Sequence, residues 1–124
     1  MNIIAHVEIP VRDLERAMTF YSTVFEITFS DITSIHGNRM AFFPFTEGQD
    51  GASGASGALA EGEIYVPTHQ GALLYFSVND IDAVLQRATH LGQQILLSKT
   101  ALDEGGFVAE IEDSEGNRIA VQML

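Results

Sequence analysis

The chain of 124 residues contains no cysteine. This absence excludes a disulfide framework, thiolate zinc sites and a cysteine nucleophile. Basic residues are scarce, since six Lys and Arg stand against 17 Asp and Glu, a formal net charge of −11. Basic side chains supply most of the affinity for phosphate backbones and anionic lipids. Neither a nucleic acid nor a membrane is therefore an expected partner.

Long apolar runs are also missing. No segment approaches the roughly 20 consecutive apolar residues of a membrane span. The residues after Met1 resemble a strand and lack the basic and apolar regions of a secretion signal. We therefore expect a cytoplasmic protein. Hydrophobic residues make up 46% of the chain, including eight Phe, which is enough for the core of a single domain.

The acidity of the chain has two interpretations. The simpler one is that a surface of net charge −11 keeps the protein soluble. The more specific one is that a cleft in this field favours a cationic or neutral ligand over an anionic one.

What the chain does contain is an internal repeat with an offset of 67 residues. Residues 11–14, VRDL, align with residues 78–81, VNDI, and each stretch follows an alternating apolar segment. Downstream, both copies place apolar residues at i, i+3, i+4 and i+7, which predicts one buried helical stripe. Asp13 and Asp80 are positioned to cap the two helices, and Gly92 to end the second.

Three strands are predicted after each helix. In the first half they span residues 27–35, 39–45 and 56–61, and in the second half residues 94–97, 106–112 and 118–124. Residues 113–117, DSEGN, predict a hairpin turn, because Gly and Asn accept a positive φ. The Gly/Ala/Ser-rich residues 48–57 predict a mobile loop. We thus expect an α+β fold of two tandem βαβββ modules, residues 1–65 and 66–124, with curved mixed sheets around a cleft.

Three stretches carry a resemblance to a known family. They are residues 6–21, HVEIPVRDLERAMTFY; residues 76–82, FSVNDID; and residues 113–119, DSEGNRI. In order and separation they resemble the vicinal-oxygen-chelate superfamily of glyoxalases, bleomycin resistance proteins and dioxygenases. The resemblance implies the fold but leaves the activity open, because one fold hosts many functions.

The resemblance also implies four metal-ligand positions, in the first and last strand of each module. His6 occupies the first position, but Leu73 and Ala120 occupy the two positions of the second half. The fourth position falls near Leu59 or Ala60, next to Glu61. Open divalent sites need about three His or carboxylate ligands, so we expect no metal or other cofactor. An unorthodox zinc, nickel or iron site built on His6, Glu8 and Glu61 is the alternative.

Strand alternation selects the candidate site residues. In residues 6–10, His6 and Glu8 share the face opposite to Val7 and Ile9, and the apolar pair is expected to face a helix. By the same parity the last strand presents Arg118 and Gln122 to the cleft, and Tyr75 is the repeat-related counterpart of Glu8. The expected ligand-binding residues are His6, Glu8, Phe42, Tyr75, Arg118 and Gln122.

Two functions follow from these residues. In the first, a cleft holds a small organic molecule without the usual metal centre of the family. In the second, a glyoxalase-like lyase, isomerase or dioxygenase uses His6 and Glu8 with an unorthodox metal site. A partner-binding module is a third and weaker alternative. We expect a homodimer, and the sequence leaves open whether the cleft forms within the chain or across the dimer.

Overall fold

The computed structural model describes residues 2–45 and 54–124. Its elements follow the order β-α-β-β-β twice, so the predicted repeat is confirmed. Module one contains β1 (His6–Val11), α1 (Leu14–Phe25), β2 (Thr33–Ile35), β3 (Asn38–Phe42) and β4 (Ser56–Glu61). Module two contains β5 (Tyr75–Ser77), α2 (Ile81–His90), β6 (Ile95–Ala101), β7 (Phe107–Glu112) and β8 (Arg118–Met123). Most of the loop predicted for residues 48–57 lies outside the described residues, and Ser56 and Gly57 belong to β4.

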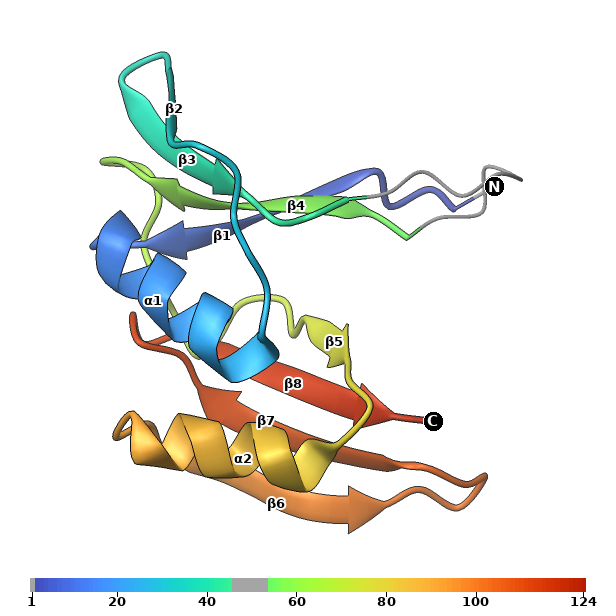
Figure 1. Cartoon of the computed structure of the whole chain (residues 1–124). Helices are drawn as coiled ribbons and strands as arrows, with labels where there is room; N and C mark the ends of the chain where they lie inside the picture. Colours follow the sequence, from blue (N-terminus) through green and yellow to red (C-terminus); the bar gives the residue numbers. More distant parts are fainter. Residues whose placement is uncertain (1, 46–53) are drawn as a thin grey trace.

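Each module forms one mixed sheet of four strands. The strand order is β1-β4-β3-β2 in the first sheet and β5-β8-β7-β6 in the second, here named sheet one and sheet two. The first and last strands of a module pair in parallel, and the other neighbours pair antiparallel. Figure 1 shows the two sheets with one helix packed on each. The α+β class and the tandem βαβββ plan are confirmed.

The helix ends follow the capping residues in the sequence. The Asp13 carboxylate accepts from the backbone N–H of Arg16 at 3.0 Å, and Asp80 accepts from Ala83 at 3.1 Å. Both bonds satisfy N–H groups that have no partner inside the helix. Gly92 follows α2 with a φ of 85°, a left-handed conformation that glycine adopts without strain. In the described chain, no helix is long and apolar enough to cross a bilayer.

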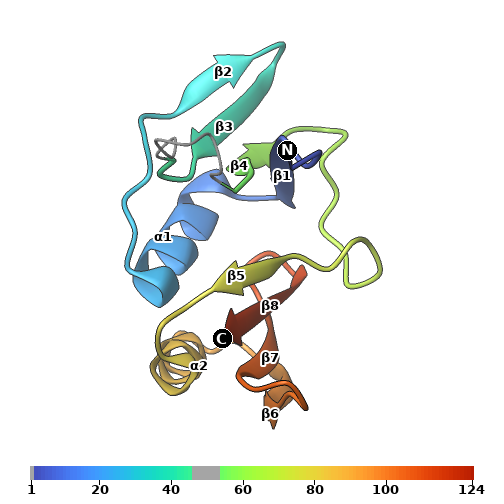
Figure 2. The ribbon, with the colours of Figure 1, turned by 90° about the vertical axis from the view of Figure 1, so that its right-hand side faces the viewer.

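The core lies between the helices and the sheets. α1 and α2 pack against each other and lie on the same side of the molecule (Figure 2). Along β1, Ile9 and Val11 are buried in this core and Val7 packs against it, whereas His6 and Glu8 are exposed. This alternation is the one predicted for residues 6–10. The face of each sheet that is turned away from the helices is called its outer face below.

Three predicted strands have clearly different bounds. The strand predicted for residues 39–45 spans Asn38–Phe42. Residues 27–32 are not in a strand, because Glu26 turns the chain with a φ of 55° and only Ser30 bonds back to β3, through Phe42 O. The strand predicted for residues 94–97 instead runs to Ala101, paired with β7 through two register shifts. The turn between β2 and β3 is tight, and both of its central residues, His36 and Gly37, have positive φ.

Candidate functional site

The outer face of sheet one carries a polar group centred on His6. The Nδ1 atom of His6 lies 2.8 Å from Oγ of Ser56, the residue directly opposite it in the ladder of β1 and β4. The Ser56 hydroxyl is also 3.2 Å from the carbonyl oxygen of Ala5. A hydroxyl has one hydrogen. When the Ser56 hydroxyl donates it to the carbonyl oxygen of Ala5, Nδ1 of His6 must donate to Ser56. Nε2 of the neutral ring then carries the free lone pair.

Glu8 is the second member of this group. One carboxylate oxygen accepts a hydrogen bond from the Tyr65 hydroxyl at 2.7 Å, and the other lies 3.6 Å from Nε2 of His6. The hydrogen bond to Glu8 is the main cause that raises the pKa of Tyr65, so the phenol stays protonated and donates. The side chains of His6 and Glu8 are 35% and 32% exposed, so both reach solvent.

The floor between these side chains is made of small residues. Ala58 and Ala60 lie on the outer face, opposite Glu8 and Pro10, and are completely buried beneath larger neighbours. The ring of Phe42 is part of the same group, with its centroid 6.1 Å from that of His6. The face therefore combines a carboxylate, an imidazole, a phenol and an aromatic wall over an alanine floor.

The remaining candidate residues lie together on the outer face of sheet two. Tyr75 is opposite the buried Ala120, and the exposed fraction of Tyr75 is 46%. Gln122 donates from Nε2 to Ser77 Oγ at 3.4 Å. Arg118 forms an ion pair with Glu110, so its charge is already compensated within the sheet.

The structure thus divides the six candidate residues into two groups. His6, Glu8 and Phe42 lie on sheet one, whereas Tyr75, Arg118 and Gln122 lie on sheet two. Within the described ranges, no hydrogen bond, ion pair or ring contact joins the two groups.

Sequence reasoning did not find Ser56 and Tyr65. Ser56 follows from the strand register, which pairs it with His6, but the register could not be assigned in advance. Tyr65 lies in the connection after β4, and no periodicity or motif links it to Glu8. Only the path of the chain over sheet one brings the two together.

A cavity of about 680 Å³ lies on the other side of the sheets, between the two modules. Its walls include Val7 and Ile9, the core-facing neighbours of His6 and Glu8. Of the six candidate residues only Tyr75 lines it. The cavity therefore shares Tyr75 and Ser56 with the outer faces, but His6, Glu8 and Phe42 are not part of its lining.

Comparison with known proteins decides the family. A family model described as Glyoxalase/Bleomycin resistance protein/Dioxygenase superfamily matches residues 3–121. The chain belongs to this superfamily. Comparison with proteins of curated function gives no significant match.

Solved structures of the superfamily share the fold. A glyoxylase/bleomycin resistance protein/dioxygenase domain from Frankia sp. EAN1pec is 18% identical, with a TM-score of 0.76 over 99% of this chain and 92% of that chain. A glyoxalase-related enzyme from Fulvimarina pelagi is 15% identical, with a TM-score of 0.73 over 100% and 89%. A mutant glyoxalase I from Zea mays is 18% identical, with a TM-score of 0.68 over 96% of this chain but 45% of that chain.

The strand register assigns the fourth superfamily ligand position. In module two, Tyr75 pairs with Ala120, and in module one the repeat-related Glu8 pairs with Ala58. The position equivalent to Ala120 is therefore Ala58, not Leu59 or Ala60 as the sequence suggested. Three of the four positions thus hold Ala58, Leu73 and Ala120, which have no donor atom. These residues do not fit the superfamily's metal centre.

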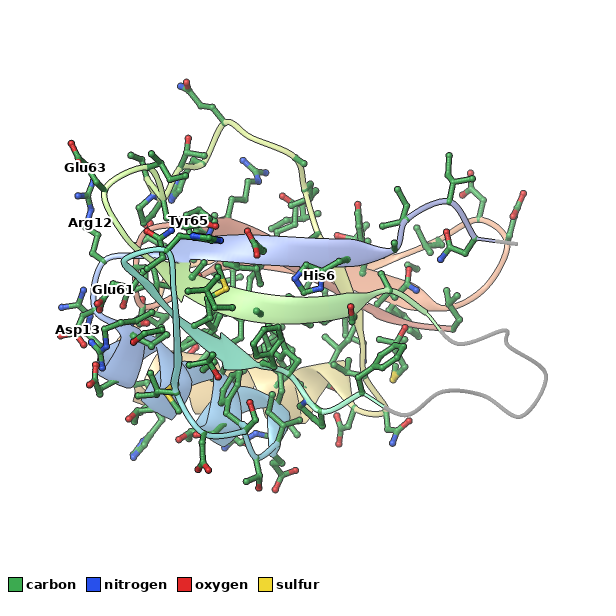
Figure 3. All side chains as sticks on the ribbon, turned by 90° about the horizontal axis from the view of Figure 1, so that it is seen from above. His6, Arg12, Asp13, Glu61, Glu63 and Tyr65 are labelled. Carbon is green, nitrogen blue, oxygen red and sulfur yellow. The ribbon has the colours of Figure 1, made fainter. Side chains whose placement is uncertain are left out.

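Glu61 does not supply the missing ligand. It lies at the end of β4, opposite Val11, five ladder positions away from the pair of His6 and Ser56. Its oxygens accept from the backbone N–H of Leu14 at 2.8 Å and from Arg39 at 3.0 Å. Figure 3 shows Glu61 near Asp13 at the start of α1, whereas His6 lies far along the strand. Across the described residues, no three His, Asp or Glu side chains are grouped as metal ligands.

Proposed function

We propose that this chain binds a small cationic or neutral organic molecule on the outer face of sheet one, without a metal ion. The observation that carries the proposal is the position of Glu8. Its carboxylate is held by Tyr65 at 2.7 Å, lies beside His6 and stands over the alanine floor. A carboxylate beside His6, on the same sheet face as the ring of Phe42, suits a cation that also contacts an aromatic face.

The donor set supports binding without a metal. His6 occupies one superfamily position, and Ala58, Leu73 and Ala120 occupy the other three. A divalent ion would gain one imidazole, and water would have to fill the rest of its coordination sphere.

We further propose that a second copy of the chain completes the site. The candidate residues of sheet two, Tyr75, Arg118 and Gln122, make no contact with those of sheet one in the described part of the chain. The outer faces also carry exposed apolar side chains, among them Ile35, Tyr75 and Leu97, which are 37%, 46% and 38% exposed. A homodimer that covers these side chains would place sheet two of one copy over sheet one of the other.

Three matched probes test the charge preference: benzyltrimethylammonium, benzyl alcohol and benzoate. Titration by nuclear magnetic resonance should give the tightest binding for the cation and the weakest for the anion. Glu8→Gln should lower the affinity for the cation by about tenfold, the equivalent of about 1.4 kcal/mol, and leave the affinity for the alcohol nearly unchanged. Glu63→Gln, in the exposed connection near Tyr65, is the matched control and should change nothing. Tightest binding of benzoate, or a cation affinity that ignores Glu8→Gln, would contradict the proposal.

A second function is favoured by the contacts of His6 and Glu8. An imidazole, a carboxylate and a protonated phenol in one chain of contacts can act as general acid and base, as a lyase or isomerase of this superfamily requires. Recovery of the bound compound decides between the two functions. Release of an unchanged compound supports binding alone, whereas a chemically changed compound, formed more slowly by Glu8→Gln, supports the enzyme.

A further inference from the structure

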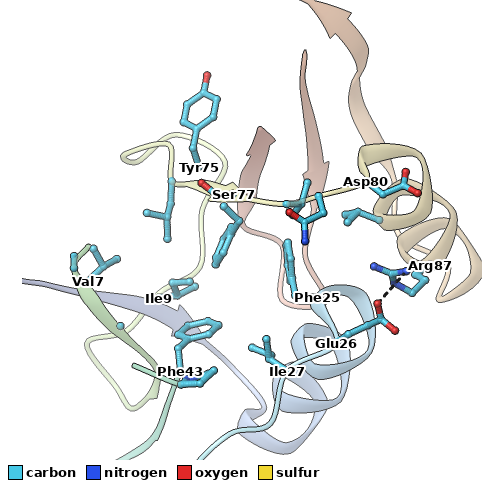
Figure 4. Close-up of a pocket in the computed structure, with 18 of the residues that line it drawn as sticks. Val7, Ile9, Phe25, Glu26, Ile27, Phe43, Tyr75, Ser77, Asp80 and Arg87 are labelled. Carbon is cyan, nitrogen blue, oxygen red and sulfur yellow. Dashed lines mark ion pairs between the residues drawn. The ribbon is translucent and has the colours of Figure 1, made fainter. Parts of the chain in front are cut away.

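The cavity between the modules has walls from both halves of the chain. Phe25 from α1, Phe43 after β3 and Phe76 from β5 form its aromatic side. The centroids of Phe25 and Phe76 are 4.7 Å apart, and those of Phe43 and Phe76 are 5.9 Å apart. Val7 and Ile9 of β1 lie on the same sheet wall as Phe43, and Figure 4 shows Ile9 beside Phe43.

Charged side chains stand at one end of the cavity. Arg87 of α2 donates from Nε to the carbonyl oxygen of Val24 at 2.9 Å and pairs with Glu26 at 3.6 Å. It thereby joins the end of α1 to α2 beside the opening (Figure 4). Asp80, which caps α2, adds a second carboxylate to the lining. This end of the cavity therefore carries two carboxylates and one guanidinium that already pairs with Glu26 and bonds to Val24.

We infer that this inter-module cavity is a second ligand site, one that binds a small, uncharged aromatic molecule. A cavity of about 680 Å³ lies in the range of small-molecule sites, roughly 300 to 1,000 Å³. Three phenylalanine rings offer faces and edges to a planar guest. The site is built from both modules, so a bound molecule contacts both halves of the core.

The lining decides the polarity of the guest. Among the described residues, every buried side-chain nitrogen or oxygen already has a hydrogen-bond partner. A polar group carried deep among the phenylalanine rings would lose its hydration. The guest is therefore apolar in its buried part. An anion is further disfavoured by Glu26, by Asp80 and by the net charge of −11.

This site is separate from the Glu8 site of the proposed function. Val7 and Ile9 lie on the opposite face of β1 from His6 and Glu8. The cavity lining includes Ser56 and Tyr75 from the outer faces but neither Glu8 nor Tyr65, so Glu8 and Tyr65 distinguish the two sites.

The experiment uses N-phenyl-1-naphthylamine, an uncharged probe whose fluorescence rises in an apolar site. We expect saturable binding with one probe per chain. The methyl resonances of Val7, Ile9 and Val78 should shift on titration, and the ring resonances of His6 and Tyr65 should not. The sulfonated analogue, 8-anilinonaphthalene-1-sulfonate, has the same rings plus one negative charge and should bind more weakly.

Ala83→Phe fills the cavity from α2, because Ala83 lines it and is partly buried. The substitution should lower the affinity for the neutral probe by roughly tenfold or more, since the new ring occupies the same space. Gln86→Phe adds the same ring at an exposed position of α2 and is the matched control. Equal affinity in Ala83→Phe and the wild type would overturn the inference. So would loss of binding in Glu8→Gln, or resonance shifts confined to the outer face of sheet one. The resonance mapping is done on the wild type, so it decides the question even if Ala83→Phe does not fold.

Discussion

The hydroxyl of Tyr21 donates a hydrogen bond to Oδ2 of Asp113 at 2.6 Å, across 92 residues of sequence. Both side chains are completely buried. The bond joins α1 of module one to the turn between β7 and β8 of module two. Asp113 also accepts from the backbone N–H groups of Glu115 and Asn117 and from the side chain of Asn117. A buried carboxylate with four donors fixes the two modules relative to each other.

Tyr21→Phe should destabilise the protein by about 1 to 3 kcal/mol, because it leaves a buried carboxylate one donor short. Burial and the nearby charge of Asp113 raise the pKa of Tyr21 well above its ordinary value, so the hydroxyl is a donor at all physiological pH. Urea unfolding measures the loss. Tyr65→Phe removes a phenol from a surface contact and should cost less than about 1 kcal/mol. Equal costs for the two variants would show that the buried bond adds nothing.

Glu115 should make stability depend on pH in acid. Burial alone would raise its pKa, but hydrogen bonds from Arg16, from Ser114 and from the backbone N–H groups of Asp13 and Arg12 lower it to about 2. A folded-state pKa below the ordinary 4.5 means that the stabilisation is fully present above pH 4.5 and is lost as the pH falls toward 2. The shift corresponds to about 3 kcal/mol.

The measurement is the free energy of unfolding in urea between pH 2 and pH 7. Glu115→Gln should be less stable than the wild type at neutral pH and should lose most of the slope below about pH 4.5. Glu112→Gln removes a surface carboxylate that pairs with His69 at 2.8 Å, and it serves as the control that keeps the slope. An unchanged acid slope in Glu115→Gln would contradict the assignment.

His6→Ala should change stability by no more than about 1 to 2 kcal/mol, because the side chain is partly exposed and makes one short hydrogen bond. The affinity for benzyltrimethylammonium should fall, since the imidazole is part of the wall beside Glu8. His90→Ala, at the exposed end of α2, is the control for a general loss of histidine. Unchanged affinity in His6→Ala would mean that His6 is not part of the ligand site.

The repeat also predicts how a metal site could be built. Leu73→His together with Ala120→Glu restores two donors at superfamily positions, and His6 is the third. If two copies bring sheet one and sheet two together, the double variant should bind zinc or nickel in calorimetry, whereas the wild type should not. His6→Ala in the same background should weaken that binding. A folded, dimeric double variant without metal affinity would show that the positions do not converge.

Much of the fold could be predicted because it depends on local chemistry. The repeat around residues 11–14 and 78–81, the caps Asp13 and Asp80, and the turn at residues 113–117 all appear in the structure. Each depends on residues that are close in sequence. The strand predicted for residues 27–35 is confirmed only for residues 33–35, because the turn at Glu26 leaves residues 27–32 mostly unpaired.

The site could be predicted only in part. Strand parity correctly separated His6 and Glu8 from Val7 and Ile9, since alternation is a local property. It could not bring Tyr65 to Glu8, because that contact depends on the path of the chain over sheet one. For residues 113–117 the sequence predicted a turn and nothing more. The burial of Asp113 and Glu115 appears only when the hairpin packs against α1.

Elemental analysis of protein purified without chelator tests the central claim most directly. Ala58, Leu73 and Ala120 leave His6 without fellow ligands. The contents of zinc, nickel and iron should therefore each be far below one atom per chain. One equivalent of any of them, retained through dialysis and lost in His6→Ala, would contradict that claim.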